Sequence, residues 1–165
     1  MRSRAAIGNH PIHPMLVPFP IGAFFLALIG DIAYSADAKT AFWYELSYVC
    51  IAVGISTALL AAVAGAIDYF SVKMSGKGFR LATWHALLNV LMLVLYTTSF
   101  FLRRHGAAAS GSRWVVAAAL GFLGFGLVAV TGWLGGSVAH EHRVGVIERL
   151  NIVKPAPHKN ERAAS

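Results

Sequence analysis

Four long apolar runs dominate the sequence and constrain its fold more than any other feature. They cover about residues 18–35, 41–67, 81–102 and 114–139. Each run is near or above the ~20 residues that an α-helix needs to cross a bilayer. Lipid offers no hydrogen bonds to the backbone, so isolated runs of this kind cross it as helices. The sequence therefore predicts an all-α integral membrane protein, a four-helix bundle with up-down-up-down topology.

Composition supports a membrane class and argues against nucleic-acid binding. The chain is 57% hydrophobic and 13% charged, against roughly 45–50% and about 25% in soluble proteins. Its net charge of +7 would suit a nucleic acid, but the basic residues lie in short segments between apolar runs. There they act as topology signals. The single cysteine, Cys50, cannot form an internal disulfide.

The distribution of lysine and arginine predicts the orientation in the membrane. Four spans place both termini and the middle loop on one side, with ten basic residues, and the other two loops opposite, with four. The positive-inside rule then places both termini in the cytoplasm. The ten are Arg2, Arg4, Lys73, Lys77, Arg80, Arg143, Arg149, Lys154, Lys159 and Arg162, and the four are Lys39, Arg103, Arg104 and Arg113.

Prolines mark the start of the chain. The segment HPIHPMLVPFPIG has four prolines from Pro11 to Pro20, which we expect to prevent a regular helix. This rigid lead would place His10 and His13 at the membrane surface, and the first helix would begin near Pro18–Pro20. We therefore divide the chain into a lead (1–14), a transmembrane domain (15–142) and a polar tail (143–165) that we expect to be disordered.

Stripes of polar or small residues predict how the helices pack. At helical spacing, one face of the third span and one face of the fourth carry such stripes, and we expect these two faces to meet inside the bundle. A small-residue ridge on the second span recurs every four residues, and no internal repeat is evident. The stripe of the third span is His85, Asn89, Met92 and Tyr96. The stripe of the fourth span is Gly121, Gly124, Val128, Thr131, Gly135, Val138 and His142. The ridge of the second span is Gly54, Ala58, Ala62 and Ala66.

The predicted topology gathers five histidines at one membrane face. His10 and His13 precede the first span, His85 begins the third, and His140 and His142 follow the fourth. Histidine is the commonest metal ligand, and bundle cores hold cofactors between facing helices. His85 with His13 or His142 would suit the axial positions of haem b, with room provided by glycines. A transition-metal site from His13, His85 and His142 is a second hypothesis. The third is that these histidines only contact headgroups or helix ends. The glycines are Gly132, Gly135 and Gly136.

Two acidic residues lie near opposite membrane faces. Asp31 is late in the first span and Asp68 ends the second. Each could belong to a proton path, but an interfacial cap or a pair with a nearby lysine or arginine is the favoured interpretation. The chain has no Gly-rich phosphate loop, nucleophile elbow or c-type haem motif, which leaves hydrolase and c-type cytochrome functions unsupported.

Four motifs together resemble the bacterial membrane family DUF2231. They are HPIHPMLVPFPIG, GAIDYF at 65–70, ATWHALLN at 82–89 and GWLGG…HRVGV at 132–146. The family is similar to small b-type cytochrome membrane domains, and some members are joined to Rieske or c-type cytochrome domains. The resemblance implies redox work and a bacterial inner-membrane location. The matching positions are His10, His13, Asp68, His85, Asn89 and His142. His140 and Ser137 depart from the family pattern, which favours an aromatic and an acidic residue there.

The leading hypothesis is a haem b membrane protein that relays electrons between a redox partner and the quinone pool. Its site would draw on His13, His85, His142, His10 and Asn89. One alternative is a non-catalytic anchor or assembly subunit for a partner protein, and another is the three-histidine metal site. The expected partners are the bilayer, an oxidoreductase and quinone, with self-association left open. Catalysis by this chain alone is not predicted.

Overall fold

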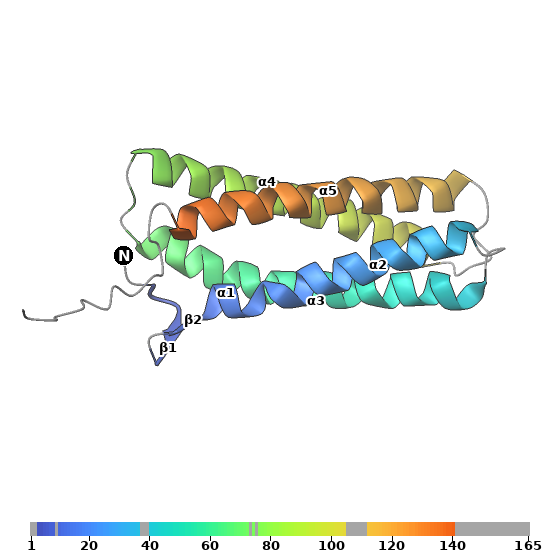
Figure 1. Cartoon of the computed structure of the whole chain (residues 1–165), viewed down its shortest axis with the longest axis horizontal. Helices are drawn as coiled ribbons and strands as arrows, with labels where there is room; N and C mark the ends of the chain where they lie inside the picture. Colours follow the sequence, from blue (N-terminus) through green and yellow to red (C-terminus); the bar gives the residue numbers. More distant parts are fainter. Residues whose placement is uncertain are drawn as a thin grey trace, which may run out of the picture.

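The fold is a bundle of four long helices, as the apolar runs predict (Figure 1). This computed structural model describes residues 3–8, 10–36, 40–72, 74, 76–104 and 112–140. A short helix, α1 (Ile12–Leu16), leads into α2 (Pro18–Ala36), and α3 (Ala41–Ser71), α4 (Gly76–Arg103) and α5 (Ser112–His140) follow. In the described residues, four segments are long and apolar enough to cross a membrane, with α1 and α2 counted as one. The polar tail lies outside the described residues.

The proline-rich lead differs from its prediction. Residues 12–16 form α1, so the prolines do not exclude a helix. Pro14 lies in the first turn of α1 and Pro18 begins α2, positions where the missing N–H is not needed by the helix. Before α1, β1 (Ala6–Ile7) and β2 (His10–Pro11) form a small antiparallel hairpin, with Gly8 in the left-handed region at φ 53°. The lead is therefore folded onto the bundle.

The bundle consists of two helix pairs. Helix α2 packs along α3, and α4 packs along α5, whereas contacts between the pairs are far fewer. Figure 1 shows α4 and α5 together above α2 and α3. The predicted facing of the third and fourth spans is thus confirmed. Their packing uses the expected stripes, because Gly124 faces Tyr96 and Gly135 faces His85.

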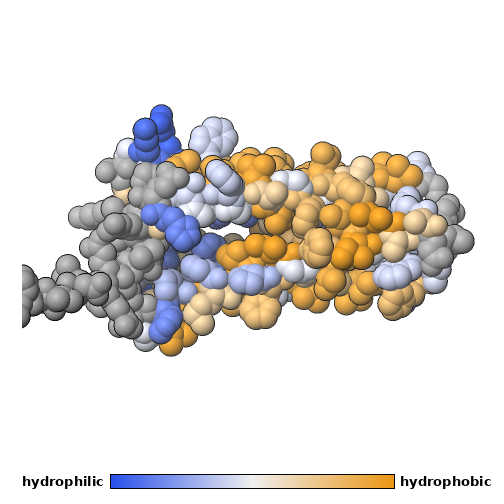
Figure 2. Space-filling view, in the orientation of Figure 1, coloured by the Kyte–Doolittle hydropathy of each residue, from blue (hydrophilic) through white to orange (hydrophobic). Residues whose placement is uncertain are grey.

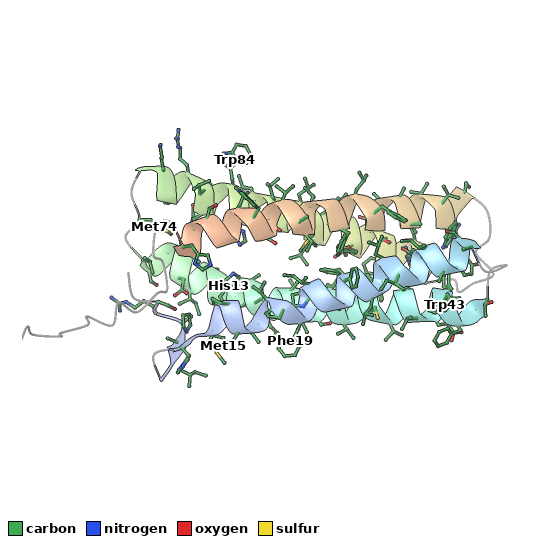
Figure 3. The ribbon with its side chains drawn as sticks, in the orientation of Figure 1. His13, Met15, Phe19, Trp43, Met74 and Trp84 are labelled. Atoms are coloured by element: carbon green, nitrogen blue, oxygen red, sulfur yellow. The ribbon has the colours of Figure 1, made fainter. Side chains whose placement is uncertain are left out.

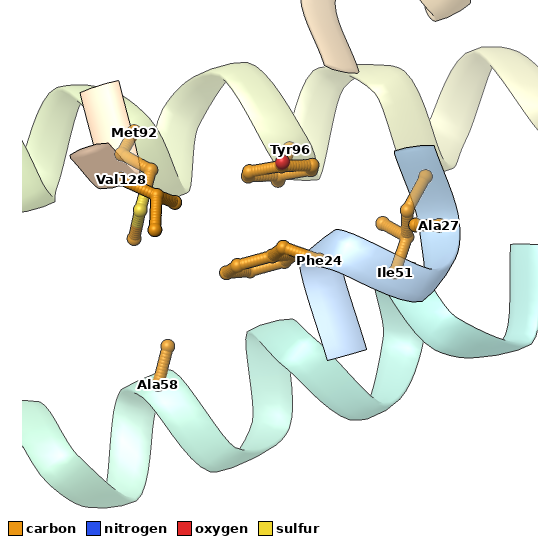
Figure 4. Packing of buried hydrophobic residues seen from close by; sticks show 7 residues of the cluster. All are labelled: Phe24, Ala27, Ile51, Ala58, Met92, Tyr96 and Val128. Carbon is orange, nitrogen blue, oxygen red and sulfur yellow. The ribbon is translucent and has the colours of Figure 1, made fainter. Parts of the chain in front are cut away.

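An aromatic stack joins the two pairs at mid-bundle (Figure 4). The rings of Phe24 on α2 and Tyr96 on α4 lie 3.7 Å apart between centroids and are nearly parallel. Each ring fills the space left by a glycine on the neighbouring helix of its own pair: Gly54 behind Phe24 and Gly124 behind Tyr96. The stack therefore depends on the absence of two side chains as much as on the rings.

The small-residue ridge of α3 follows a different line from the predicted one. Gly54 and Ala58 are buried as expected, but Ala62 and Ala66 are exposed. Ala61 takes over the buried face. The reason is the helical period of 3.6 residues, from which a spacing of four drifts within two turns.

The two helix pairs are repeats of one unit, contrary to the expectation that the chain has no internal repeat. Equivalent residues make equivalent contacts, so the pairs are related by an approximate two-fold axis that runs along the bundle. On α1–α2 and α4 the equivalents are 72 residues apart: His13 and His85, Phe24 and Tyr96, Asp31 and Arg103. On α3 and α5 they are 70 apart: Gly54 and Gly124, Ala61 and Thr131, Gly65 and Gly135.

The outer surface of the bundle is apolar along most of its length. Figure 2 shows hydrophobic side chains over the middle of the bundle, with hydrophilic ones gathered toward the end that carries the hairpin. Large apolar side chains such as Phe19, Leu60 and Leu123 are more than half exposed, and Figure 3 shows Phe19 and Trp84 pointing outward. A surface of this kind is suited to lipid.

We expect Gly54→Ala to destabilise the bundle. A Cβ at this position would lie 2.4 Å from Cε1 of Phe24, and overpacking of this kind costs about 1–3 kcal/mol. Gly126→Ala is the matched control, because nothing lies within 4 Å of its Cβ position and alanine favours a helix. Unfolding in mixed detergent micelles measures both variants. Equal stability of the two would contradict the packing of Phe24 against Gly54.

Candidate functional site: a histidine pair between the helix pairs

The imidazole ring of His13 packs against α3 and bonds to a backbone carbonyl of that helix. It lies on α1, and its Nδ1 is 2.8 Å from the carbonyl oxygen of Ala61. A Cβ on Gly65 would lie 3.0 Å from this Nδ1, so the glycine leaves the imidazole its place against the helix. A carbonyl oxygen only accepts, so Nδ1 carries the proton. Nε2 is then the ring nitrogen with the lone pair when the imidazole is neutral.

His85 repeats this arrangement on the other helix pair. It lies on α4, and its Nδ1 donates to the carbonyl oxygen of Thr131 on α5 at 2.9 Å. A Cβ on Gly135 would lie 2.9 Å from Cε1 of the ring. Metal-bound histidines commonly donate their other N–H to a carbonyl oxygen in this way, which fixes the tautomer and the ring orientation. Both imidazoles are therefore anchored from behind.

The two imidazoles meet across the space between the helix pairs. Their ring centroids are 6.2 Å apart and their planes are nearly perpendicular, at 87°. A metal between two histidines needs ~2 Å for each bond. A ring nitrogen lies about 1 Å from its ring centre, as the ring bond lengths dictate. A ligating pair would thus have its ring centres about 6 Å apart, so His13 and His85 are already at the required separation.

Asn89 is the third polar residue of the site. Its Nδ2 donates to the carbonyl oxygen of His85 at 2.7 Å and lies 3.2 Å from Nε2 of the same histidine. Because Nδ1 of His85 carries its proton, Nε2 accepts the second bond. His85 and Asn89, neighbours on the predicted polar stripe, are thus in direct contact, which orients the His85 ring at both nitrogens.

A hollow and an apolar layer lie next to the histidines. Figure 2 shows a hollow between the two helix pairs at this end, and Figure 3 shows His13 between them, while Met15 points outward. Deeper in the bundle, Met92, Ala58 and Val128 form the next layer (Figure 4).

The other predicted histidines do not join this pair in the described residues. His10 is exposed in the hairpin, with Nδ1 3.0 Å from the carbonyl oxygen of Gly8. His140 is exposed at the end of α5, and His142 lies outside the described residues. Among the residues that are described, no group of three or more His, Cys, Asp or Glu side chains is placed to hold a metal. A three-histidine centre would depend on His142.

The glycines that were expected to make room differ in their positions. Gly135 faces the His85 ring, but nothing lies within 4 Å of the Cβ positions of Gly132 and Gly136. On α3, Gly65 has the role that was expected of those two. The equivalence of Gly65 and Gly135 becomes visible only once the repeat is known.

Asp68 fastens the N-terminal lead beside the site. Its Oδ1 accepts the backbone N–H groups of Arg4 and Ala5 at 2.8 and 3.0 Å, and Ser3 Oγ lies 2.7 Å from its Oδ2. Ala5 in turn accepts the N–H of Ile12, the first residue of α1. The carboxylate thereby acts as a cap for the lead, and through the lead it fixes the start of the helix that carries His13.

A buried ion pair at the far end of the bundle was missed by the sequence interpretation. Arg103 was assigned to a loop, and this was wrong, because it is the last residue of α4 and only 1% exposed. It makes a two-pronged bond with Asp31, at 2.6 Å from Nη1 to Oδ1 and 2.8 Å from Nη2 to Oδ2. The favoured pairing of Asp31 with a basic residue is therefore confirmed. The separation of 72 residues, equal to that of the histidine pair, is the signal that could have found it.

The ion pair is embedded in hydrogen bonds from all four long helices. Arg103 donates to Ser47 on α3 and to Ser99 on its own helix, while the hydroxyl of Tyr44 donates to its carbonyl oxygen at 2.7 Å. Ser99 completes the set by donating to the carbonyl oxygen of Ala117 on α5. The guanidinium thus bonds through four of its five N–H groups, and a charge that is paired and hydrogen-bonded is what an apolar bundle tolerates.

The fold and the site define a class: a four-helix membrane protein with a half-buried histidine pair and a buried ion pair between its helix pairs. Residues 9–148 match the family described as predicted membrane protein (DUF2231). Since the match covers most of the chain, the protein belongs to this family. No curated protein and no solved structure matches the chain.

Proposed function

We propose that this membrane protein binds haem b between His13 and His85 and relays electrons. The observation that carries the proposal is the histidine pair itself, with ring centroids 6.2 Å apart and each Nδ1 bound to a backbone carbonyl of its own helix pair. Nε2 is thereby the nitrogen of each ring that a metal would take, although Nε2 of His85 also accepts a hydrogen bond from Asn89. Haem b would supply one-electron redox chemistry at this place.

The surroundings of the pair support a flat ligand more than a bare ion. His13 and His85 belong to opposite helix pairs. A flat ligand bound between the helix pairs would therefore lie between the two imidazole rings. Toward mid-bundle, the buried residues Met92, Ala58 and Val128 supply apolar surroundings. Within the described residues, a bare transition metal would have only two histidine ligands. Protein metal sites commonly supply three or four ligands.

Electron relay is the role that fits such a site. His13 and His85 would both hold the haem, which would supply one-electron chemistry and leave the chain in the role of an electron carrier. The site would lie inside a bundle whose apolar outer surface suits lipid, and quinone dissolves in lipid. A redox enzyme at the aqueous face would be the second partner, as the resemblance to b-type cytochrome domains implies.

The absorption spectrum of the purified protein tests the proposal. Haem b gives a Soret band and one iron per chain by elemental analysis. Metal in stoichiometric amount without a Soret band would favour a transition-metal site, and His142 would then be the ligand to examine. Neither signal, also after incubation with hemin, would overturn the proposal in favour of a membrane anchor.

We further propose that both termini lie in the cytoplasm of the bacterial inner membrane. The ten-to-four charge count supports this orientation, and burial of Arg103 in an ion pair leaves only three basic residues at the opposite face. Alkaline phosphatase fused after Met74 or Ser165 should be inactive, and fused after Ala108 it should be active. An active fusion after Met74 would reverse the orientation and move the histidine pair to the other face.

A further inference from the structure

The repeat shows where the two histidines of the site differ. His13 and His85 occupy equivalent positions and make equivalent bonds through Nδ1, to Ala61 and to Thr131. One turn further along the helix the equivalence ends: position 89 is asparagine, and its counterpart at position 17 is valine. Any difference between the two imidazoles as ligands therefore has an identifiable source.

The asparagine occupies the lone pair that a metal would use. Asn89 donates one hydrogen to the His85 carbonyl oxygen at 2.7 Å and the other to Nε2 at 3.2 Å. Within the described residues, Nε2 of His13 receives no hydrogen bond, because valine at position 17 has no group to donate. A ligand that takes Nε2 of His13 breaks nothing, whereas one that takes Nε2 of His85 must displace the amide.

We propose that Asn89 is a positioning residue that makes His85 the weaker and exchangeable ligand of the pair, with His13 the primary one. The inference rests on the proposed haem site. The bond from Asn89 is a neutral hydrogen bond, whose net contribution corresponds to about a three- to tenfold change in an equilibrium. The amide thus lowers the affinity of His85 for a metal by that factor and leaves His13 unaffected.

A cycle of variants in the full chain tests this, with hemin as the probe. The His85→Ala chain presents only His13, and the His13→Ala chain presents only His85. We expect the His85→Ala chain to bind hemin about three- to tenfold more tightly, by Soret titration. Adding Asn89→Val, the residue of the equivalent position, should raise the affinity of the His13→Ala chain to that level and leave the His85→Ala chain unchanged. An equal effect of Asn89→Val in both chains, or in neither, would overturn the inference.

A second measurement needs no haem and separates the inference from the proposed function. In the hemin-free protein labelled with ¹⁵N-histidine, Asn89→Val should move the Nε2 resonance of His85, because that nitrogen loses a hydrogen bond, and should leave that of His13 in place. An unmoved His85 resonance would refute the role of Asn89, whatever binds at the site. If the resonance moves but hemin does not bind to the unaltered chain, the proposed function fails and the control of His85 by Asn89 stands.

Discussion

Replacing either His13 or His85 by alanine is expected to weaken haem binding by more than about 100-fold. Even the hydrogen-bond partners of metal ligands contribute 10–100-fold, and each of these residues would be a ligand itself. Titration of the detergent-purified chain with hemin measures the loss, and the spectrum shows whether the remaining imidazole still ligates. The two variants should differ from each other far less than both differ from the unaltered chain.

The histidines outside the pair provide the controls. His10→Ala and His140→Ala remove exposed imidazoles and should leave hemin affinity unchanged. The alanine variants of the pair also remove the hydrogen bond from Nδ1 to a helix carbonyl, with a net contribution of about 0.5–1.5 kcal/mol, so their folding must be verified by thermal unfolding. Retention of the full Soret band by folded His13→Ala and folded His85→Ala would exclude this pair as the ligands.

Arg103→Ala is expected to destabilise the protein by about 3–5 kcal/mol, because it leaves the carboxylate of Asp31 buried and unpaired. Asp31 is 2% exposed, so water cannot replace the lost partner. Arg104→Ala is the matched control: Arg104 is exposed, and its guanidinium carbon lies 6.0 Å from the centroid of the Phe101 ring. Unfolding in mixed micelles compares the two. Similar stability of the two variants would contradict the importance of the ion pair.

The same ion pair allows a test of the repeat. Positions 31 and 103 are related by the approximate two-fold axis, so exchanging the charges, Asp31→Arg with Arg103→Asp, should regain much of the stability that either single substitution loses. Recovery will be incomplete, because Ser99 and Ser47, which serve Arg103, have alanines as their equivalents, Ala27 and Ala117. A double variant no more stable than the single ones would argue against equivalent surroundings.

The sequence predicts the helices and the faces they bury, because both depend on local patterns. Apolar length determines which segments cross the membrane, and helical spacing places Met92 and Tyr96 on one inner face, where the structure has them buried. The convergence of His13 with His85 followed from topology alone. Which of the two N-terminal histidines turns inward did not, since this depends on α1, a five-residue helix that the prolines were wrongly expected to prevent.

The repeat and the ion pair were hidden for a physical reason. The halves share few identical residues, and what they share is a ring on one helix and a glycine opposite it, as with Phe24 and Gly54. Such a match is a property of two helices at once, and no single stretch of sequence displays it. Arg103 stands beside Arg104 at the end of an apolar run, where positive charge normally marks a loop. Only its partner on another helix distinguishes it.

The two-fold relation also explains why the two halves gain from being one chain. A strict two-fold axis between identical subunits sets each residue on the axis opposite its own copy. Two separate copies of either half would bury aspartate against aspartate, or arginine against arginine, with no partner for either charge. Joining the halves allows position 31 and position 103 to diverge into opposite charges. With opposite charges at these positions, a first half pairs more stably in the membrane with a second half than with another first half.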